Sequence, residues 1–140
     1  MFIKQLSIFV ENKFGRLEVI IDALSRNGIN IRALSIAETT DFGILRVIVD
    51  DCDKAKKVLS DIGVVAKTTD VIAVYIDDKA GGLASILKLI TEANINVEYM
   101  YAFLSRKDTS KALMVLKADD EEKAQEVLKK NNVELFDENL

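Results

Sequence analysis

An internal duplication is the feature of this sequence that most constrains its fold. Residues of the first half recur 66 positions further on, as in the pairs Lys13 and Lys79, Gly15 and Gly81, Leu17 and Leu83, and Ile20 and Ile86. Later in each copy the offset is 69, and the three additional residues (69 − 66 = 3) fit in the polar stretch 105–111. A repeat of this length indicates one structural unit that occurs twice. We therefore expect two domains, residues 1–69 and residues 70–140.

Each copy contains the same order of hydrophobic patterns. In the first copy, residues 6–10 alternate as a strand does, and residues 17–24 repeat at the spacing of one helical face. The segments 29–38 and 42–49 predict two further strands, Asp53 is the expected cap of a second helix, and "VVAKT" predicts a closing strand. Right-handed crossovers fold this order into a ferredoxin-like βαββαβ unit, with strand order 4-1-3-2 and both helices on one face.

The predicted fold class is therefore α+β, and the two units are expected to pair. A unit of about 65 residues has a small core of its own. In the order 4-1-3-2 the second strand lies at a sheet edge, where it can pair with another strand. The second strands at 31–37 and 97–104 are rich in β-forming residues and contain no proline. We predict one eight-stranded antiparallel sheet joined through these edges, with the helices on one face; sheets packed back to back are the alternative.

The composition excludes several classes of function. The chain has no histidine and one cysteine, which rules out Ser-His and Cys-His catalysis, zinc sites that contain histidine, and thiolate clusters. The lone Cys52 lies between two aspartates that oppose thiolate formation, so we interpret it as a small packing residue. We predict no catalytic residue, no metal site and no cofactor.

Charge and hydropathy limit the partners and the location. The net charge is −4, and Lys and Arg are spread along the chain, which predicts no nucleic-acid partner. The chain has no apolar run of the roughly 18 to 20 residues that a membrane helix needs. Its first ten residues alternate like a strand, unlike a signal peptide. We expect a cytoplasmic protein with no membrane partner.

The stretch "NKFGRL" at 12–17, matched by "DKAGGL" at 78–83, stands between a predicted strand and a predicted helix. One interpretation is local: glycine permits a tight turn, and Asn12 or Asp78 can bond the nearby backbone. The other is functional, because free N–H groups at a helix N-terminus favour an anion. A carboxylate would then lie against residues 15–17, while Asn12 or Asp78 could hold an ammonium group. A site that binds both groups recognises amino acids.

Two ferredoxin-like units, each with an "N/D-x-x-G-x-L" turn and an "N-I" or "N-V" start to the second strand, resemble tandem ACT domains over essentially the whole chain. The resemblance implies a regulatory protein without catalytic activity that binds an amino acid and controls a separate target enzyme or regulator. It also implies that the ligand lies where the first turn of one unit faces the second strand of a paired unit.

The resemblance implies a set of ligand-binding residues. The two turns contribute Asn12, Gly15 and Leu17, and Asp78, Gly81 and Leu83; the starts of the second strands contribute Asn30 and Ile31, and Asn96 and Val97. Phe14 and Ala80 stand where many family members have proline, and Phe14 is a candidate pocket wall. Arg16 has Gly82 as its counterpart, so the copies are unequal, and the sequence leaves open whether one site or both bind a ligand. Further candidates are Tyr99 and Tyr101 on one strand face, and Glu38 with Thr39, Thr40 and Asp41 in a hairpin.

Assembly and two competing functions complete the sequence-based expectations. Phe9 and Tyr75 fall on the strand face opposite the core, which predicts a homodimer that covers part of that face. An alternative function is an interaction or regulatory subunit of a metabolic enzyme that binds no ligand. A small acylphosphatase-like hydrolase is a weaker alternative, since Arg16 fits it but its fuller motif is missing.

Overall fold

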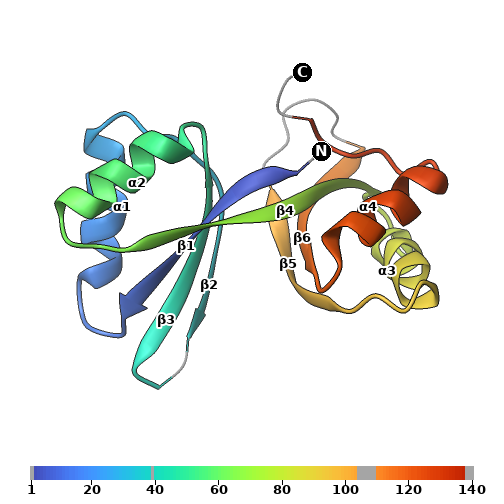
Figure 1. The fold of residues 1–140 in the computed structure, drawn as a ribbon, viewed down its shortest axis with the longest axis horizontal. Helices are drawn as coiled ribbons and strands as arrows, with labels where there is room; N and C mark the ends of the chain where they lie inside the picture. Colours follow the sequence, from blue (N-terminus) through green and yellow to red (C-terminus); the bar gives the residue numbers. More distant parts are fainter. Residues whose placement is uncertain (1, 39, 104–109, 138–140) are drawn as a thin grey trace. The chain divides into compact units, whose positions relative to one another are not determined.

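A computed structural model describes residues 2–38, 40–103 and 110–137, and in these ranges it contains six strands and four helices (Figure 1). The elements in chain order are β1 (Ile3–Glu11), α1 (Arg16–Arg26), β2 (Ile31–Glu38), β3 (Phe42–Val49), α2 (Cys52–Asp61), β4 (Ala66–Asp77), α3 (Gly82–Glu92), β5 (Val97–Phe103), β6 (Lys111–Ala118) and α4 (Glu121–Lys130). Thr39 and most of the predicted insertion at 105–111 lie outside the described residues.

The chain divides into two compact units, residues 4–69 and residues 1–3 with 70–140. In the first unit the strand order is β2-β3-β1, with antiparallel pairing that sets Ile36 opposite Leu45 and Leu6 opposite Val47. The second unit repeats the order as β5-β6-β4, with Val74 opposite Met114. This α+β arrangement fits a pair of ferredoxin-like units, in which the third strand lies between the first and the second.

The predicted eight-stranded sheet joined through the second strands is wrong. The described strands number six, in the order β2-β3-β1-β4-β6-β5, and β2 and β5 stand at its two ends. One reason is that β4 runs without a break through residues 66–77, where we expected two strands; no glycine or proline interrupts this segment. The other is that the closing strand of the second copy is reduced to one isolated bridge, from Leu135 to Val74.

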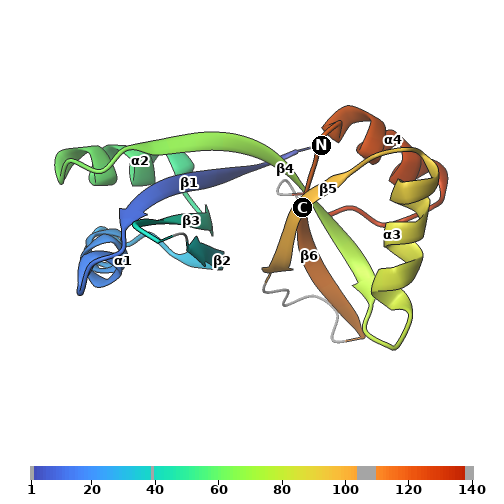
Figure 2. The same cartoon turned by 90° about the horizontal axis from the view of Figure 1, so that it is seen from below.

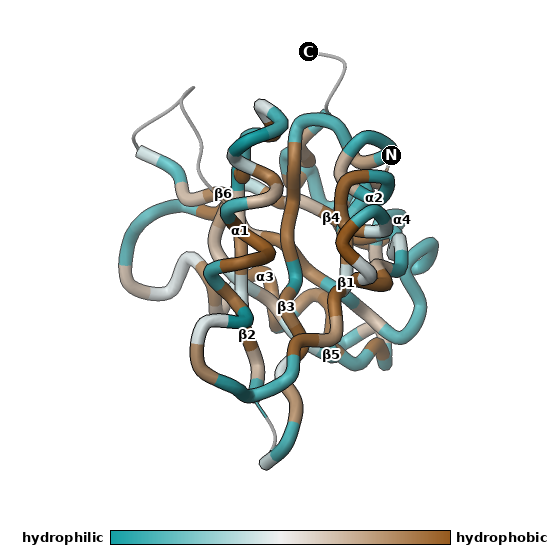
Figure 3. The backbone as a smooth tube through the Cα atoms, turned by 90° about the vertical axis from the view of Figure 1, so that its left-hand side faces the viewer, coloured by the Kyte–Doolittle hydropathy of each residue, from teal (hydrophilic) through white to brown (hydrophobic). Residues whose placement is uncertain are grey.

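Each unit buries one face of its strands against its own two helices (Figures 1 and 2). In the first unit, Leu6 and Val47 of the strands pack with Leu24 of α1 and Leu59 of α2. The second unit repeats this core with Ile72, Leu116, Ile90 and Leu128. Hydrophobic residues accordingly follow the strands in Figure 3, whereas the connections between elements are mostly hydrophilic. The alternating strand patterns of the sequence therefore mark the buried face correctly.

The two pairs of helices begin in different ways. Asp51 caps α2 by accepting a hydrogen bond from the Lys54 N–H at 3.0 Å, and Asp120 caps α4 in the same manner. The predicted cap, Asp53, is wrong because α2 begins at Cys52 and Asp53 lies within its first turn. The helices α1 and α3 begin instead at glycines, without a side-chain cap.

Candidate functional site

The turn into α1 recurs with the same geometry at α3. Gly15 has φ 81° and Gly81 has φ 89°, both in the left-handed region that disfavours residues with a side chain. A Cβ added at either glycine would meet no atom within 4 Å, so backbone conformation and not space requires glycine. In the first turn the Arg16 N–H donates to the Lys13 carbonyl at 3.2 Å. That N–H is therefore used within the turn, and Arg16 has its side chain to offer to an anion.

The predicted residues Asn12 and Asp78 both tie their turns to the neighbouring strand connection. The Asn12 N–H donates to the Asp41 carbonyl at 3.0 Å, and its Nδ2 lies 3.5 Å from the Thr40 carbonyl oxygen. The Asp78 N–H donates to the Ser110 carbonyl at 3.1 Å. The structure thus brings Asn12 beside two residues of the predicted hairpin, Thr40 and Asp41, and leaves its side chain exposed.

The asparagines that start the second strands have a structural partner. The Asn30 N–H donates to Oδ1 of Asp50 at 3.1 Å, and the Asp50 N–H donates back to the Asn30 carbonyl at 3.2 Å. Asn96 and Asp119 form the same reciprocal pair. These contacts fix the start of β2 beside the end of β3, and the start of β5 beside the end of β6. They use only the backbone of the two asparagines.

The other strand candidates differ in exposure. Tyr99 and Tyr101 stack on one another with ring centroids 6.4 Å apart and an 18° interplanar angle, and Tyr101 is buried. Glu38 is exposed at the end of β2, and Ile31 and Val97 are half-buried. The predicted approach of each turn to the second strand of the other copy stays a prediction.

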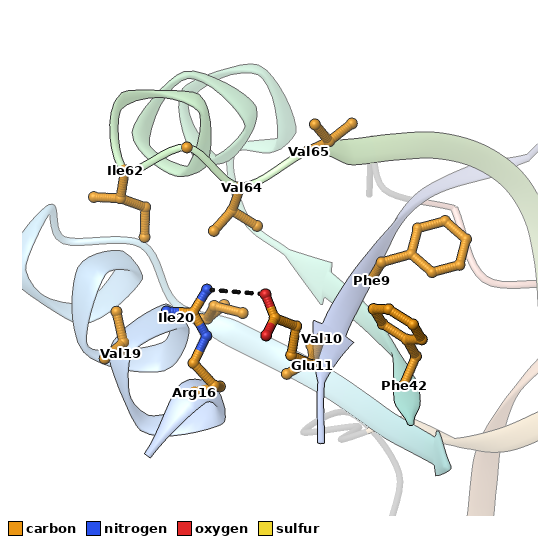
Figure 4. Close-up of a pocket in the computed structure, with 11 residues that line it drawn as sticks. Phe9, Val10, Glu11, Arg16, Val19, Ile20, Phe42, Ile62, Val64 and Val65 are labelled. Atoms are coloured by element: carbon orange, nitrogen blue, oxygen red, sulfur yellow. Dashed lines mark ion pairs between the residues drawn. The ribbon is translucent and has the colours of Figure 1, made fainter. Parts of the chain in front are cut away.

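A pocket of about 250 Å³ opens next to the first glycine turn, entirely within the unit of residues 4–69. The end of β1, the first two turns of α1, the start of β3 and the segment that follows α2 form its walls. Figure 4 shows Ile62 and Val64 above the Arg16 guanidinium, Val19 on the α1 side, and Phe9 and Phe42 next to one another on the strand side. Most of the wall is therefore apolar, and charge is confined to one place.

That charge is a cluster of three side chains from β1 and the turn. Arg16 Nη2 lies 3.8 Å from Glu11 Oε1, and Lys13 Nζ lies 3.0 Å from Glu11 Oε2. The hydrogen bond from Lys13, followed by the positive charges of Lys13 and Arg16, lowers the pKa of Glu11 below its ordinary value. All three side chains are between two-fifths and three-quarters exposed, so the pairs hold their geometry weakly. The cluster carries a net charge of +1, from one carboxylate, one exposed ammonium group and one exposed guanidinium.

The pocket contains one of the predicted site residues, Arg16. Phe14, the predicted wall, is fully exposed and does not line it. Sequence reasoning missed Glu11, Val19 and Ile62; Ile62 is the C-cap residue that follows α2, and it is exposed. The signal that could have found Val19 and Ile62 is the repeat itself, because their counterparts Ser85 and Asn131 are polar.

The described residues carry no sign of two other kinds of site. No group of three or more Cys, Asp or Glu side chains in these ranges is arranged to hold a metal ion. Among the four described helices, none has the length and apolarity to cross a membrane.

The protein consists of two copies of one α+β unit, and in each copy a glycine turn precedes the first helix. A family model described as an ACT domain pair matches residues 1–140. The protein therefore belongs to the ACT domain pair family, which confirms the resemblance to tandem ACT domains.

Solved structures share this fold. Protein BT0572 from Bacteroides thetaiotaomicron is 42% identical, with 97% of this chain and 92% of that chain covered and a TM-score of 0.90. The ligand-free regulatory subunit of aspartate kinase from Thermus thermophilus is 16% identical over 91% of each chain, with a TM-score of 0.65. The corresponding subunit from Thermus flavus is 15% identical, with 91% of this chain and 90% of that chain covered and a TM-score of 0.59. A search of curated proteins finds no match.

Proposed function

We propose that this protein is a regulatory module without catalytic activity, which binds a free amino acid and thereby controls a separate enzyme or regulator. One ACT domain is assigned to each of residues 1–69 and 70–140. The observation that carries the proposal is the position of the Arg16–Glu11 pair, at the wall of a 250 Å³ pocket that adjoins the Gly15 turn. A guanidinium and a carboxylate side by side offer partners for the two charged ends of an amino acid.

The electrostatics of the turn support the carboxylate end of this assignment. The positive end of the α1 macrodipole lies at Gly15, and the net charge of the Lys13, Glu11 and Arg16 cluster is +1. An Arg guanidinium binds a carboxylate in a planar, two-point geometry that a lysine ammonium does not provide. We propose that Gly15 and Leu17 line the carboxylate position with Arg16, and that Asn12 borders it. The remaining predicted residues of both copies stay predictions.

The solved relatives guide the choice of a partner. Two structures with the same fold are described as regulatory subunits of aspartate kinase. Their identity to this chain is 16% and 15%, so they indicate a kind of partner and not a particular one. We propose that the target is a separate enzyme of amino-acid metabolism, whose activity changes when the ligand is bound.

A thermal-shift screen of the twenty amino acids tests the proposal. A ligand that binds only the folded state stabilises it by RT ln(1 + [L]/Kd), which is about 2.7 kcal/mol at a hundredfold excess over Kd. We expect at least one amino acid to raise the melting temperature of the wild-type protein, and Arg16→Gln to abolish the increase without lowering the melting temperature of the free protein. No increase with any amino acid would contradict the proposal.

An interaction subunit that binds no ligand is the second candidate, and the edge strand β2 favours it. Leu34 and Ile36 of this strand are about half exposed. Exposed apolar residues on an edge strand are typical of a surface that pairs with another chain. Equilibrium dialysis against a mixture of amino acids separates the two candidates, because this second one predicts that no amino acid is retained.

A further inference from the structure

The second copy provides an internal reference for the pocket of the first. Strand register identifies Phe42 with Lys111, since Phe42 lies opposite Glu11 and Lys111 lies opposite Asp77, the counterpart of Glu11. The glycines that begin α1 and α3 identify Val19 with Ser85, four residues further on. Ile62 and Asn131 are the C-cap residues of α2 and α4, so they correspond to one another. Val65 and Glu134 each lie three residues further on, so they correspond as well.

At all four positions an apolar side chain of the first copy corresponds to a polar one in the second. The apolar side chains are exposed in the first copy, at 51% for Phe42, 51% for Val19, 44% for Ile62 and 80% for Val65. The second copy has the same fold with polar residues there, so the fold does not require apolar residues at these positions. Exposed apolar side chains that the fold does not require, and that lie beside a pocket, indicate a binding surface.

The polar residues of the second copy interact with each other and with their helix. Lys111 Nζ lies 3.3 Å from Glu134 Oε2, in the places where the first copy has Phe42 and Val65. Asn131 Nδ2 donates to the Val127 carbonyl at 2.8 Å. Lys111, Glu134 and Asn131 thus have partners within their own unit, whereas Val19, Ile62 and Val65 of the first pocket are exposed.

The cation of the pocket also has no counterpart, for a steric reason. Gly82 occupies the position of Arg16, and it is buried. A Cβ at Gly82 would collide with the backbone carbonyl of Asp77. The second turn therefore excludes a side chain where the first carries its guanidinium.

From these differences we infer that the pocket of the first unit binds an amino acid with an apolar side chain, and that the second unit has no equivalent site. The inference rests on the proposed function and names the class of its ligand. The ligand carboxylate lies on Arg16, its ammonium group on Glu11, and its side chain between Val19, Ile62 and Val64. The volume of about 250 Å³ suits one small ligand, since pockets for drug-sized molecules range from about 300 to 1,000 Å³.

Both charged partners are available to such a ligand. Arg16 Nη2 lies 3.8 Å from Glu11 Oε1, at the outer limit of an ion pair, Lys13 Nζ lies 3.0 Å from the other oxygen of Glu11, and Arg16 and Glu11 are both about half exposed. A pair of this kind contributes little on its own, so the two side chains can turn to the ligand at small cost. The apolar walls then lose their contact with water when the ligand side chain enters, which favours binding.

Isothermal titration calorimetry with L-leucine tests the inference, with variants that exchange residues between the copies. Val19→Ser and Ile62→Asn place the polar residues of the second copy in the first pocket. Both sites are exposed, so these variants are expected to fold. Removing apolar contact of this size from a pocket weakens binding by about tenfold or more. The matched control is Ser85→Val, which makes the reverse change in the second copy and should leave the affinity for L-leucine unchanged.

Three ligands extend the test. L-aspartate should bind at least tenfold more weakly than L-leucine, and 4-methylpentanoate, which is leucine without its amino group, should also bind more weakly because Glu11 loses its partner. Unchanged L-leucine affinity in both Val19→Ser and Ile62→Asn would overturn the pocket assignment. Tight binding of L-aspartate with no response to these variants would overturn it as well, and in both cases the proposed amino-acid function would stand. If none of the twenty amino acids binds, the proposed function itself fails.

Discussion

Replacing Gly15 with alanine separates the structural role of the first turn from its role in binding. Gly15 has φ 81°, and forcing a residue with a side chain into the left-handed region costs roughly 1–2 kcal/mol. Domains have free energies of unfolding of about 5–15 kcal/mol, so the variant should remain more than about 99% folded. A loss of affinity in this variant therefore cannot be due to unfolded protein.

The space around Gly15 gives the second half of the prediction. A Cβ at Gly15 would meet no protein atom within 4 Å, so the added methyl group projects into open space and would disturb only a bound ligand. If a carboxylate lies against this backbone, the methyl group removes a charge-assisted hydrogen bond worth about 1.5–3 kcal/mol. The affinity for the ligand should then fall by roughly ten- to a hundredfold.

Two measurements on the same protein decide between these roles. Urea denaturation followed by circular dichroism gives the loss in free energy of unfolding, and calorimetry with L-leucine gives the affinity of the folded protein. Gly81→Ala is the matched control, because Gly81 has φ 89° and equally open space, and its copy lacks the arginine. Both variants should lose similar stability, and only Gly15→Ala should lose affinity. Wild-type affinity in folded Gly15→Ala protein would refute a role of this turn in binding.

Three further predictions concern stability and assembly. Gly82→Ala should lower the free energy of unfolding, measured in urea, because the added Cβ would collide with the Asp77 carbonyl. Overpacking of this kind costs about 1–3 kcal/mol or more. A loss under about 0.5 kcal/mol would show that the turn relaxes freely. Burial, and secondarily the charge of Glu98, raises the pKa of Glu121 from its ordinary value of 4.5, although the Ala118 N–H and Lys117 oppose the shift. The stabilisation from this group is therefore complete below about pH 4.5 and is lost as the pH rises through the raised pKa. Urea denaturation should show that the free energy of unfolding declines less over that pH window in Glu121→Gln than in the wild-type protein. Identical pH profiles of the unfolding free energy in the two proteins would contradict the raised pKa. Light scattering should give a homodimer at micromolar concentration; a monomer of 15.6 kDa would refute that expectation.

The element order could be predicted because two copies of one pattern agree. The helix α1 begins after Gly15 and ends at Arg26, before the Asn27-Gly28 pair, and Gly28 has the positive φ of 70° expected after a helix. The strand count could not be predicted in the same way. The boundary between the copies falls within a continuous stretch of β-forming residues, so nothing local indicates that the last strand of one copy and the first of the next are a single strand.

Of the residues that the sequence predicts for the site, Arg16 lines the pocket. A glycine turn is a local feature, and its repetition made it visible in the sequence. The pocket walls are not local, because Val19 of α1 and Ile62 after α2 come together only when the two helices pack on the same sheet face. Each of these residues alone looks like an ordinary member of an amphipathic helix. Comparing the two copies position by position distinguishes Val19 and Ile62 from ordinary helix residues, because the corresponding residues of the second copy are polar.

A titration followed by amide chemical shifts tests most directly whether this protein binds an amino acid at the first turn. Uniformly ¹⁵N-labelled protein is titrated with L-leucine, and the amide signals of Gly15, Gly63 and Gly81 are followed. We predict saturable shifts for Gly15 in the turn and for Gly63 at the pocket wall, and no shift for Gly81. Shifts of equal size at Gly15 and Gly81 would contradict the inequality of the copies, and no shifts with any of the twenty amino acids would contradict amino-acid binding.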